Sequence, residues 1–390
     1  MRTRESEKQL KPEIELLLCC ARRGLDAAHA ARLKAILQGS IDWELLFALA
    51  TQSGLLPLLC EHLGPSSLLP PNFREANRQN AVRALFLTAE LLRIIDRFSE
   101  KQLLALPYKG PVLSQMAYAN PLLRQFDDLD FVVPQRFISS VYKEMARLGY
   151  QPKFQRVQSS GGADVHIPGE YVFVHKVNRA MVEVHTAGTL RHFPRLPNIE
   201  DMSRRSMEVT LNGRQISTFG WADTLLMLCV HGAKDFWSRL IWIADVAGIV
   251  DRLDAADWKR VLTEARKCDA ERMLRLGLWL ARAIFESKVP ADILQNVERD
   301  RVAARIGSEL RRRLLYQKKH PQGIVWRSRY RIGMVQSIWK GTSYWLRLST
   351  TLAEEDWVAA PNARIRGVTY AFLRPLRLWR KYRRSVALNK

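Results

Sequence analysis

The sequence predicts an α+β protein in which a small mixed sheet with flanking helices lies between extensive N- and C-terminal helical regions. Apolar residues recur at three- and four-residue spacing over residues 12–100 and again after residue 221, as in amphipathic helices. Runs rich in β-branched and aromatic residues gather between residues 101 and 220. The same stretch contains Asn212-Gly213, a dipeptide typical of two-residue hairpin turns.

The expected elements follow from local patterns. Residues 12–64 predict helices, Pro65–Pro71 a loop, and residues 72–100 one long helix with an apolar stripe. In the middle of the chain we expect, in order, a short strand and turn in 103–110, a helix over 111–118, a strand over 126–133, a helix over 134–150 that begins at Pro134, strands over 171–177 and 181–187, and a hairpin over 206–219.

Length and cysteine content narrow the class of protein. A chain of 390 residues allows two or three domains and a sizeable core. Its five cysteines show no C-x-x-C spacing, and the polar N-terminal segment lacks the apolar run of a signal peptide. No run of 18 apolar residues is present. We therefore expect reduced thiols and a cytoplasmic location.

Positive charge is concentrated at the C-terminal end. The net charge is +22, and residues 301–390 hold 21 lysines and arginines against four acidic residues, a net of +17. Arginines alternate with Trp and Tyr in the segments 311–320 and 374–384. Such segments favour a polyanion or an anionic membrane surface as partner, although a solvated basic helix face is equally consistent with the pattern.

The candidate chemistry centres on Asp128 and Asp130. Residues two apart in a strand share one face, so the two carboxylates project together. They repel each other unless a cation lies between them, and oxygen-rich sites of this kind suit Mg²⁺. Glu183, in a second strand-like run, supplies a third acid. The alternative is that Asp128 belongs to a turn with Asp127 and that Asp130 is solvated.

Several residues near these acids are candidates for contact with phosphate. Lys109-Gly110 stands where the chain leaves a strand and enters a helix, a place where backbone amides attract anions. Ser114 lies one turn further on, and Arg124 precedes the acidic strand. Their structural alternatives are a surface lysine at an ordinary turn, core packing for Ser114, and an ion pair with Asp127 or Asp128 for Arg124.

Two histidines and a lysine complete the candidate set. His185 shares a strand face with Glu183, two residues away. His231 and Lys234 are three apart and lie on one helix face. These residues could contact a nucleotide, and Asp245 could accept from a nearby Lys or Arg. A structural, hydrogen-bonded histidine is nearly as consistent with the position of His185, and His231 taken alone is more typical of a hydrogen-bonded core residue.

These motifs in this order resemble the uncharacterised nucleotidyltransferase family of bacteria, a branch of the polymerase-beta-like superfamily. The resemblance covers roughly residues 40–260. Its features are Lys109-Gly110, Tyr118, Pro121, Arg124, Asp128-x-Asp130, the strand Glu183-Val184-His185 and the helical run from His231.

The resemblance implies a function and an organisation. The function is transfer of a nucleoside monophosphate from an NTP to an acceptor, with Mg²⁺ or Mn²⁺ bound by Asp128, Asp130 and Glu183. The expected regions are an N-terminal helical region at 1–100, a catalytic core at 101–220, a helical domain capping the cleft at 221–300 and a basic helical region at 301–390.

The acceptor, the base of the NTP and the oligomeric state remain open. Two other classes of function stay in view. One is a non-catalytic nucleotide-binding module. The other is a protein that binds nucleic acid or an anionic membrane through its basic C-terminus, which would place it at the inner face of the membrane.

Overall fold

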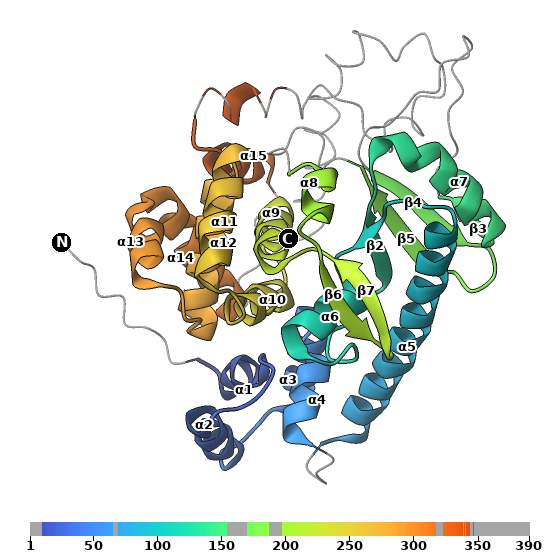
Figure 1. Ribbon diagram of the computed structural model, residues 1–390. Coiled ribbons are helices and arrows are strands. Elements are labelled where there is room, and N and C mark those ends of the chain that lie inside the picture. The colour runs from blue at the N-terminus through green and yellow to red at the C-terminus, as the bar shows by residue number, and fades with distance from the viewer. Residues whose placement is uncertain are drawn as a thin grey trace.

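The computed structural model describes residues 10–64, 69–153, 170–186, 197–316 and 323–337, together with 339, 341–343 and 346. It has an α+β fold, as the sequence predicts, with a mixed sheet on one side and helices around it (Figure 1). The N-terminal helices are α1 (Pro12–Cys20), α2 (Ala27–Leu37), α3 (Trp43–Ser53), α4 (Leu56–Leu63) and the long α5 (Pro71–Glu100).

The main sheet has five strands in the order β1-β2-β5-β4-β3. Its strands are β1 (Leu106–Pro107), β2 (Asp128–Val132), β3 (Tyr150–Pro152), β4 (Glu170–His175) and β5 (Met181–His185). The central pair β2 and β5 is parallel, whereas the other neighbouring pairs are antiparallel. The strands β4 and β5, which the sequence predicts over 171–177 and 181–187, pair antiparallel.

A separate two-stranded sheet is formed by β6 (Met207–Leu211) and β7 (Arg214–Thr218). Its turn is Asn212-Gly213, and both residues have positive φ, at 49° and 77°. This conformation suits the twist of a tight hairpin and is open to Asn and Gly at little cost. The hairpin predicted from this dipeptide is confirmed.

The elements between and after the strands are helical. They are α6 (Gly110–Tyr118), the 3₁₀ turn η1 (Gln135–Phe137), α7 (Ile138–Arg147), α8 (Ile199–Ser203), α9 (Trp221–Lys234), α10 (Leu240–Val250), α11 (Ala255–Lys267), α12 (Glu271–Phe285), α13 (Ala291–Arg299), α14 (Arg301–Leu315) and α15 (Ile324–Met334). The helix expected to begin at Pro134 instead begins with a 3₁₀ turn, and its α-helical part starts at Ile138.

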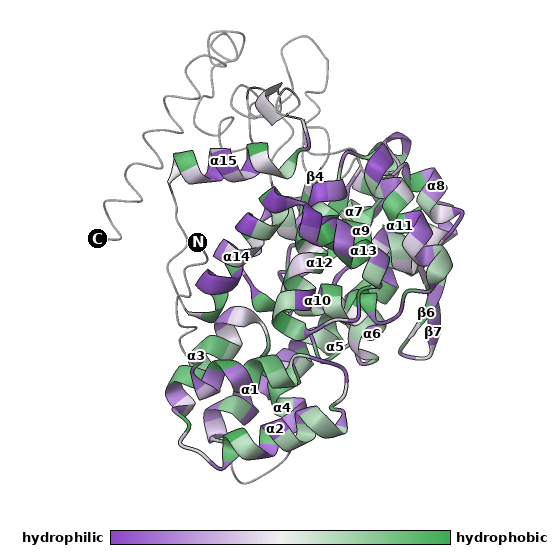
Figure 2. Cartoon of the chain, turned by 90° about the vertical axis from the view of Figure 1, so that its left-hand side faces the viewer, coloured by the Kyte–Doolittle hydropathy of each residue, from purple (hydrophilic) through white to green (hydrophobic). Residues whose placement is uncertain are grey.

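Apart from a smaller apolar cluster around β1 and α8, one connected apolar core joins these parts. It extends from Ile14 in α1 through Phe131 in β2 to Met334 in α15. All five cysteines are buried free thiols, in agreement with the expectation of reduced thiols. In Figure 2 the basic helices α14 and α15 carry several hydrophilic segments. Within the part of the chain that the structure describes, no helix is both long and apolar enough to cross a bilayer.

Residues 317–322 and 347–390 lie outside the described part of the chain, and so the basic segment 374–384 lies outside it as well. The four regions expected along the chain therefore stay a prediction of organisation. Within the described residues, α14 packs on α12 and buries Ala303 and Leu310.

Candidate functional site

The parallel pair β2 and β5 brings the candidate acids together. Asp130 lies directly opposite Glu183 in the register, and Asp128 lies opposite Met181. The strands alternate, so Asp128 and Asp130 share a face with Glu183 and His185. We call these four side chains the acid cluster. Two short apolar runs, one on each strand, thus build the cluster from segments more than 50 residues apart in the chain.

Three members of the acid cluster are in close contact. One ligand atom each from Asp130, Glu183 and His185 lies within 4.8 Å of the others. His185 Nε2 is 3.2 Å from Asp130 Oδ1 and 3.7 Å from Glu183 Oε2. The Asp130 side chain is only 3% exposed, whereas that of Glu183 is 23% exposed. Glu183 is therefore the acid that solvent reaches more easily.

Asp128 and Asp130 lie on the same face of β2, but their pKa values are shifted in opposite directions. Burial raises the pKa of Asp128 to about 6, and the negative charge of Asp130 adds to the rise. Burial also raises the pKa of Asp130, but the Lys109 ammonium and His185 outweigh it, so that this pKa lies below its usual value. Asp130 is thus ionised. Ionising Asp128 as well costs free energy, because it places a second negative charge beside the first.

Lys109 and Gly110 border the acid cluster. Lys109 Nζ donates to Asp130 Oδ1 at 2.9 Å. Burial lowers the pKa of Lys109, but the charge of Asp130 outweighs it, and the net pKa lies above its usual value. Gly110, at the start of α6, has a φ of +54°, and a Cβ there would lie 3.4 Å from the carbonyl oxygen of Asp128. Glycine is favoured here because of this positive φ, and the helix start packs closely on β2.

Ser114 and Arg124 make structural contacts. Ser114 is fully buried, and its Oγ donates to the carbonyl of Asn120 at 2.8 Å. This contact agrees with the packing alternative for Ser114. Arg124 Nε donates to Asp245 Oδ2 at 2.9 Å, so its ion pair is with α10 and not with Asp127 or Asp128. The same Asp245 accepts from the Tyr118 hydroxyl at 2.9 Å.

The C-terminal end of α9 lies beside the acid cluster. Burial lowers the pKa of His231 well below its usual value, and the charges of Lys109 and Lys234 lower it further. The ring is therefore neutral near pH 7. Its Nδ1 is 3.4 Å from Asp235, and its edge meets Trp242 at a centroid distance of 5.2 Å. The charges of Lys109 and Asp130 thus act on His231, which lies on the same helix as Lys234.

Three buried polar atoms at or next to the acid cluster lack a hydrogen-bond partner of ordinary geometry. They are His185 Nδ1, Thr186 Oγ1 and the hydroxyl of Tyr108, and other such atoms lie elsewhere, for example on Trp237 and Tyr330. Buried polar groups in native proteins nearly always have partners, so the three atoms beside the acids are candidates for contact with a ligand. The sequence analysis missed Tyr108, because a tyrosine at a strand end is most simply a core residue.

The donor set fits a divalent cation. Two carboxylates from neighbouring strands supply hard oxygen ligands, and His185 adds a nitrogen. Carboxylate oxygens suit Mg²⁺, while an added imidazole also suits Mn²⁺. Asp128 lies outside the group of three within 4.8 Å but is coupled to it by charge. The buried atoms without partners beside the acids agree with this fit.

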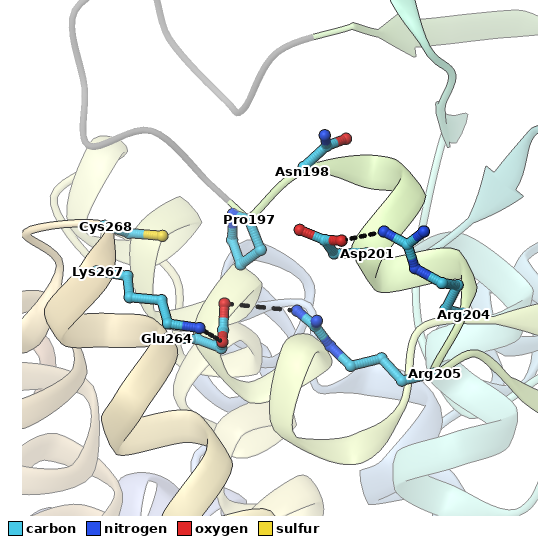
Figure 3. A pocket seen from close by; sticks show the side chains of 8 residues that line it. All are labelled: Pro197, Asn198, Asp201, Arg204, Arg205, Glu264, Lys267 and Cys268. Atoms are coloured by element: carbon cyan, nitrogen blue, oxygen red, sulfur yellow. Dashed lines mark hydrogen bonds and ion pairs between the residues drawn. The ribbon is translucent and has the colours of Figure 1, made fainter.

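A separate open pocket of about 610 Å³ lies between α8 and α11 (Figure 3). Its charged side chains pair with one another: Glu264 accepts from Lys267 at 2.8 Å and lies 3.6 Å from Arg205. Arg205 also donates to Asp223 of α9, at 2.6 and 2.8 Å. These pairs hold the short helix α8 against α9 and α11, which fixes its position beside β1.

A family model described as "Uncharacterised nucleotidyltransferase" matches residues 39–286. Among solved structures, the antibiotic-resistance factor ANT(2'')-Ia is 12% identical with a TM-score of 0.34, over 47% of this chain and 92% of that chain. The lincosamide antibiotic adenylyltransferase LnuA is 15% identical with a TM-score of 0.30, over 41% and 94%.

A nucleotidyltransferase-like protein from Paracoccidioides brasiliensis is 13% identical with a TM-score of 0.27, over 53% of this chain and 96% of that chain. No curated protein matches this sequence. TM-scores this low support no conclusion about function. The family match covers more than half of the chain, and it coincides with the resemblance carried by Lys109-Gly110 and Asp128-x-Asp130.

Proposed function

Because the chain belongs to the uncharacterised nucleotidyltransferase family, we propose that it transfers a nucleoside monophosphate from a Mg²⁺-bound NTP to an acceptor and releases pyrophosphate. The observation that carries the proposal is the register of the two parallel strands. Asp130 and Glu183 stand side by side, together with His185, directly beside Lys109 and Gly110. The residue roles below belong to this proposal.

Asp128, Asp130 and Glu183 would hold the metal. When bound, Mg²⁺ polarises the α-phosphate and stabilises the charge that develops on the attacking and leaving oxygens. Mn²⁺ could take its place, because His185 offers a nitrogen ligand. Metal binding requires both aspartates to ionise, and the cation would offset the cost of ionising Asp128, whose pKa is raised to about 6 by burial and by the charge of Asp130.

Glu183 is the residue suited to accept the acceptor's proton, because its side chain is 23% exposed, against 3% for Asp130. In this step a bond forms between the acceptor oxygen and the α-phosphorus. The bond from that phosphorus to pyrophosphate breaks, and the acceptor's proton passes to Glu183. Lys109, which donates to Asp130 in this structure, is placed to turn toward the phosphates of an arriving NTP.

The remaining candidates have supporting positions. The neutral ring of His231, on α9, lies in the electrostatic field of Asp130 and Lys109, and the charge of Lys234 acts on the same ring. Gly110 lets α6 begin against β2, which brings backbone amides of the helix start near Asp128. Arg124 contributes positive charge near Asp128 while it stays bound to Asp245.

Pyrophosphate release tests the proposal. The wild-type protein is incubated with each of the four common NTPs, with Mg²⁺ or with EDTA, in the presence of a deproteinised extract of the source cells as the supply of acceptor. We expect metal-dependent pyrophosphate release and incorporation of label from the α-phosphate. Absence of both with every NTP, from a folded protein, would contradict the proposal.

Two variants then separate the proposed roles. Asp130→Asn removes an ionised ligand, so it should abolish metal-dependent NTP binding and transfer together. Glu183→Gln keeps the size of the side chain but cannot take a proton. It should reduce the single-turnover rate about 10²–10⁴-fold with a smaller effect on NTP affinity. An unchanged rate in Glu183→Gln would return Glu183 to a structural role and favour a non-catalytic nucleotide-binding module.

A further inference from the structure

Tyr108 lies in the wall of the candidate site, between β1 and the start of α6. Its ring packs on Phe219 at a centroid distance of 5.5 Å and meets the edge of His185 at 5.9 Å. Ile199 and Met202 of α8 belong to the same apolar cluster as Tyr108. The residue is 3% exposed, so these contacts fix the position of its ring and therefore of its hydroxyl.

The hydroxyl of Tyr108 is buried and makes no hydrogen bond of ordinary geometry with the described residues, although the Lys109 ammonium interacts with its oxygen. It lies in the electrostatic field of Lys109, Asp130 and Glu183. The Lys109 ammonium is 5.1 Å from the centre of the ring, and it donates to Asp130. An ammonium has no lone pair to offer. The proton of the Tyr108 hydroxyl therefore has no acceptor here.

The buried hydroxyl of Tyr330, on α15, also lacks a partner, whereas two other buried tyrosines of the protein have one. The Tyr150 hydroxyl donates to Glu90 at 2.7 Å, and the Tyr118 hydroxyl donates to Asp245 at 2.9 Å. The fold thus supplies a carboxylate acceptor to each of these hydroxyls. Around the Tyr108 hydroxyl, by contrast, the fold supplies apolar side chains and a neighbouring cation but no acceptor. This environment suits a hydroxyl whose acceptor is part of a bound ligand.

The chemistry of that acceptor follows from the neighbours. Burial raises the pKa of Tyr108 above its usual range, so the hydroxyl stays protonated and acts as a donor. A fixed donor next to an ammonium complements an anionic oxygen. The acid cluster cannot be the partner without leaving its own contacts. The ligand group that fits both Tyr108 and Lys109 is a phosphate.

We propose that the Tyr108 hydroxyl donates a hydrogen bond to a phosphate oxygen of the bound nucleotide, next to Lys109. This inference rests on the proposed function and names a binding residue that the sequence motifs do not contain. It also explains why α8 is held against β1: the ion pairs of Arg205 keep in place the helix that packs on the Tyr108 ring.

Tyr108→Phe tests this directly, because it removes one oxygen and leaves the ring. The probes are Mg²⁺-ATP (or whichever of the four NTPs binds wild type most tightly) and Mg²⁺-tripolyphosphate, which lacks the nucleoside. Titration calorimetry should show both binding about 10-fold to 100-fold more weakly to the variant, as for a lost hydrogen bond to a charged group. Without ligand, the variant should melt at the same temperature as wild type or higher.

Tyr150→Phe is the matched control, because it removes a hydroxyl that is satisfied by Glu90, away from the acid cluster. It should lower the melting temperature and leave the affinity for both probes unchanged. Tyr108→Phe is thus expected to lower affinity without lowering the melting temperature, and Tyr150→Phe to lower the melting temperature without lowering affinity.

Three results would overturn the inference alone while wild type still binds NTP. They are unchanged affinity in Tyr108→Phe, a lower melting temperature of that variant without ligand, and weaker binding of the NTP but not of tripolyphosphate. The last would place the contact on the nucleoside. If wild type binds none of the NTPs in the presence of Mg²⁺, the proposed function fails, and the inference fails with it.

Discussion

At the residue scale, the candidate site combines two aspartates whose environments differ although they are two residues apart. Asp130 is nearly fully buried and bonded to Lys109, while Asp128 is partly exposed and opposes the charge of Asp130. The ionised form of Asp128 is therefore repelled by Asp130, and a bound cation would reduce this repulsion. Side-chain arrangements that lower stability, such as two neighbouring buried carboxylates, are typical of functional sites.

The pKa of about 6 at Asp128 predicts how stability depends on pH without metal. Between its ordinary pKa and pH 6, folded Asp128 holds a proton that the unfolded chain releases. Its contribution to the free energy of unfolding therefore falls as pH rises through this range. Asp128→Asn removes the effect, so the variant should gain stability relative to wild type on going from pH 4 to pH 7. The gain should be on the order of 1–3 kcal/mol.

Urea denaturation of both proteins at several pH values measures this difference, and the comparison cancels the opposite trend expected from neutral His231. Adding Mg²⁺ at pH 7 should reverse the order, because only wild type retains the full ligand set. A difference between the two proteins that does not change with pH would show that Asp128 is not under strain.

Local pattern was sufficient to predict that Asp128 and Asp130 project together, because alternation within a strand puts them on one face. The position of Glu183 beside Asp130 depends on the pairing of β2 with β5, and only the family resemblance led us to expect it. The partner of Arg124 was not predictable. Asp245 lies 121 residues away, and local patterns favour the nearer Asp127 and Asp128. The missing acceptor of Tyr108 is a property of packing, which no motif records.

At the scale of elements, a buried polar network ties the acidic strand to α10. Asp245 is fully buried and receives Arg124 from the loop before β2 and Tyr118 from the end of α6. Burial raises the pKa of Asp245, and its two donors oppose the rise. The network fixes both ends of the segment between α6 and β2, and so fixes the approach of the chain to Asp128.

Breaking this network should be costly. Asp245→Ala leaves Arg124 buried without its carboxylate and should lower the free energy of unfolding by about 3–5 kcal/mol. Tyr118→Phe removes one hydrogen bond and should cost only about 1 kcal/mol. The double variant Arg124→Met with Asp245→Leu should lose less than Asp245→Ala, because no buried charge is left unpaired. Urea denaturation decides; a double variant less stable than the single one would argue against a coupled pair.

The sequence correctly identifies Gly110 as the turn that starts a helix, but it suggests only part of the reason why this residue is a glycine. The sequence motif suggests a glycine that lets phosphate approach the backbone. In the structure its positive φ and the close carbonyl of Asp128 already require glycine before any ligand binds. Gly213 also has positive φ, but nothing lies within 4 Å of its Cβ position, so there the turn conformation alone requires it.

At the scale of the whole molecule, the basic C-terminal region divides into packed and exposed parts. Arg313 pairs with Glu309 and lies over the ring of Trp326, with 4.8 Å between the guanidinium carbon and the ring centroid. It therefore supports the packing of α15 on α14. Arg312 and Arg329, by contrast, are exposed on these two helices. Only the exposed arginines suit a test of docking.

Charge reversal at Arg312 and Arg329 to Glu should weaken binding to vesicles that contain an anionic lipid, at about 1 kcal/mol or more per site. Mg²⁺-NTP affinity should not change, because both residues lie outside the acid cluster. Reversal of the exposed Arg74 and Lys143, on α5 and α7, is the control with the same change in net charge. Vesicle flotation measures binding, and equal loss in both double variants would show that only net charge matters.

The overall architecture could be predicted because its signals are local: helical periodicity, strand composition and the Asn212-Gly213 turn. Strand order and the parallel pairing of β2 with β5 could not, because they depend on contacts between segments far apart in the chain. The same limit applies to α14, which looks like a basic tail in sequence but packs against α12 through Ile306 and Leu310.

The central claim, that Asp128, Asp130 and Glu183 hold the catalytic metal, is tested most directly by anomalous X-ray scattering. Crystals grown with Mn²⁺ and a non-hydrolysable NTP analogue would be measured at the manganese edge. We predict a peak about 2.0–2.3 Å from carboxylate oxygens of Asp130 and its neighbours, with Lys109 turned away from Asp130 toward the phosphates. A nucleotide bound without a manganese peak at these acids, or a peak elsewhere in the protein alone, would contradict the claim.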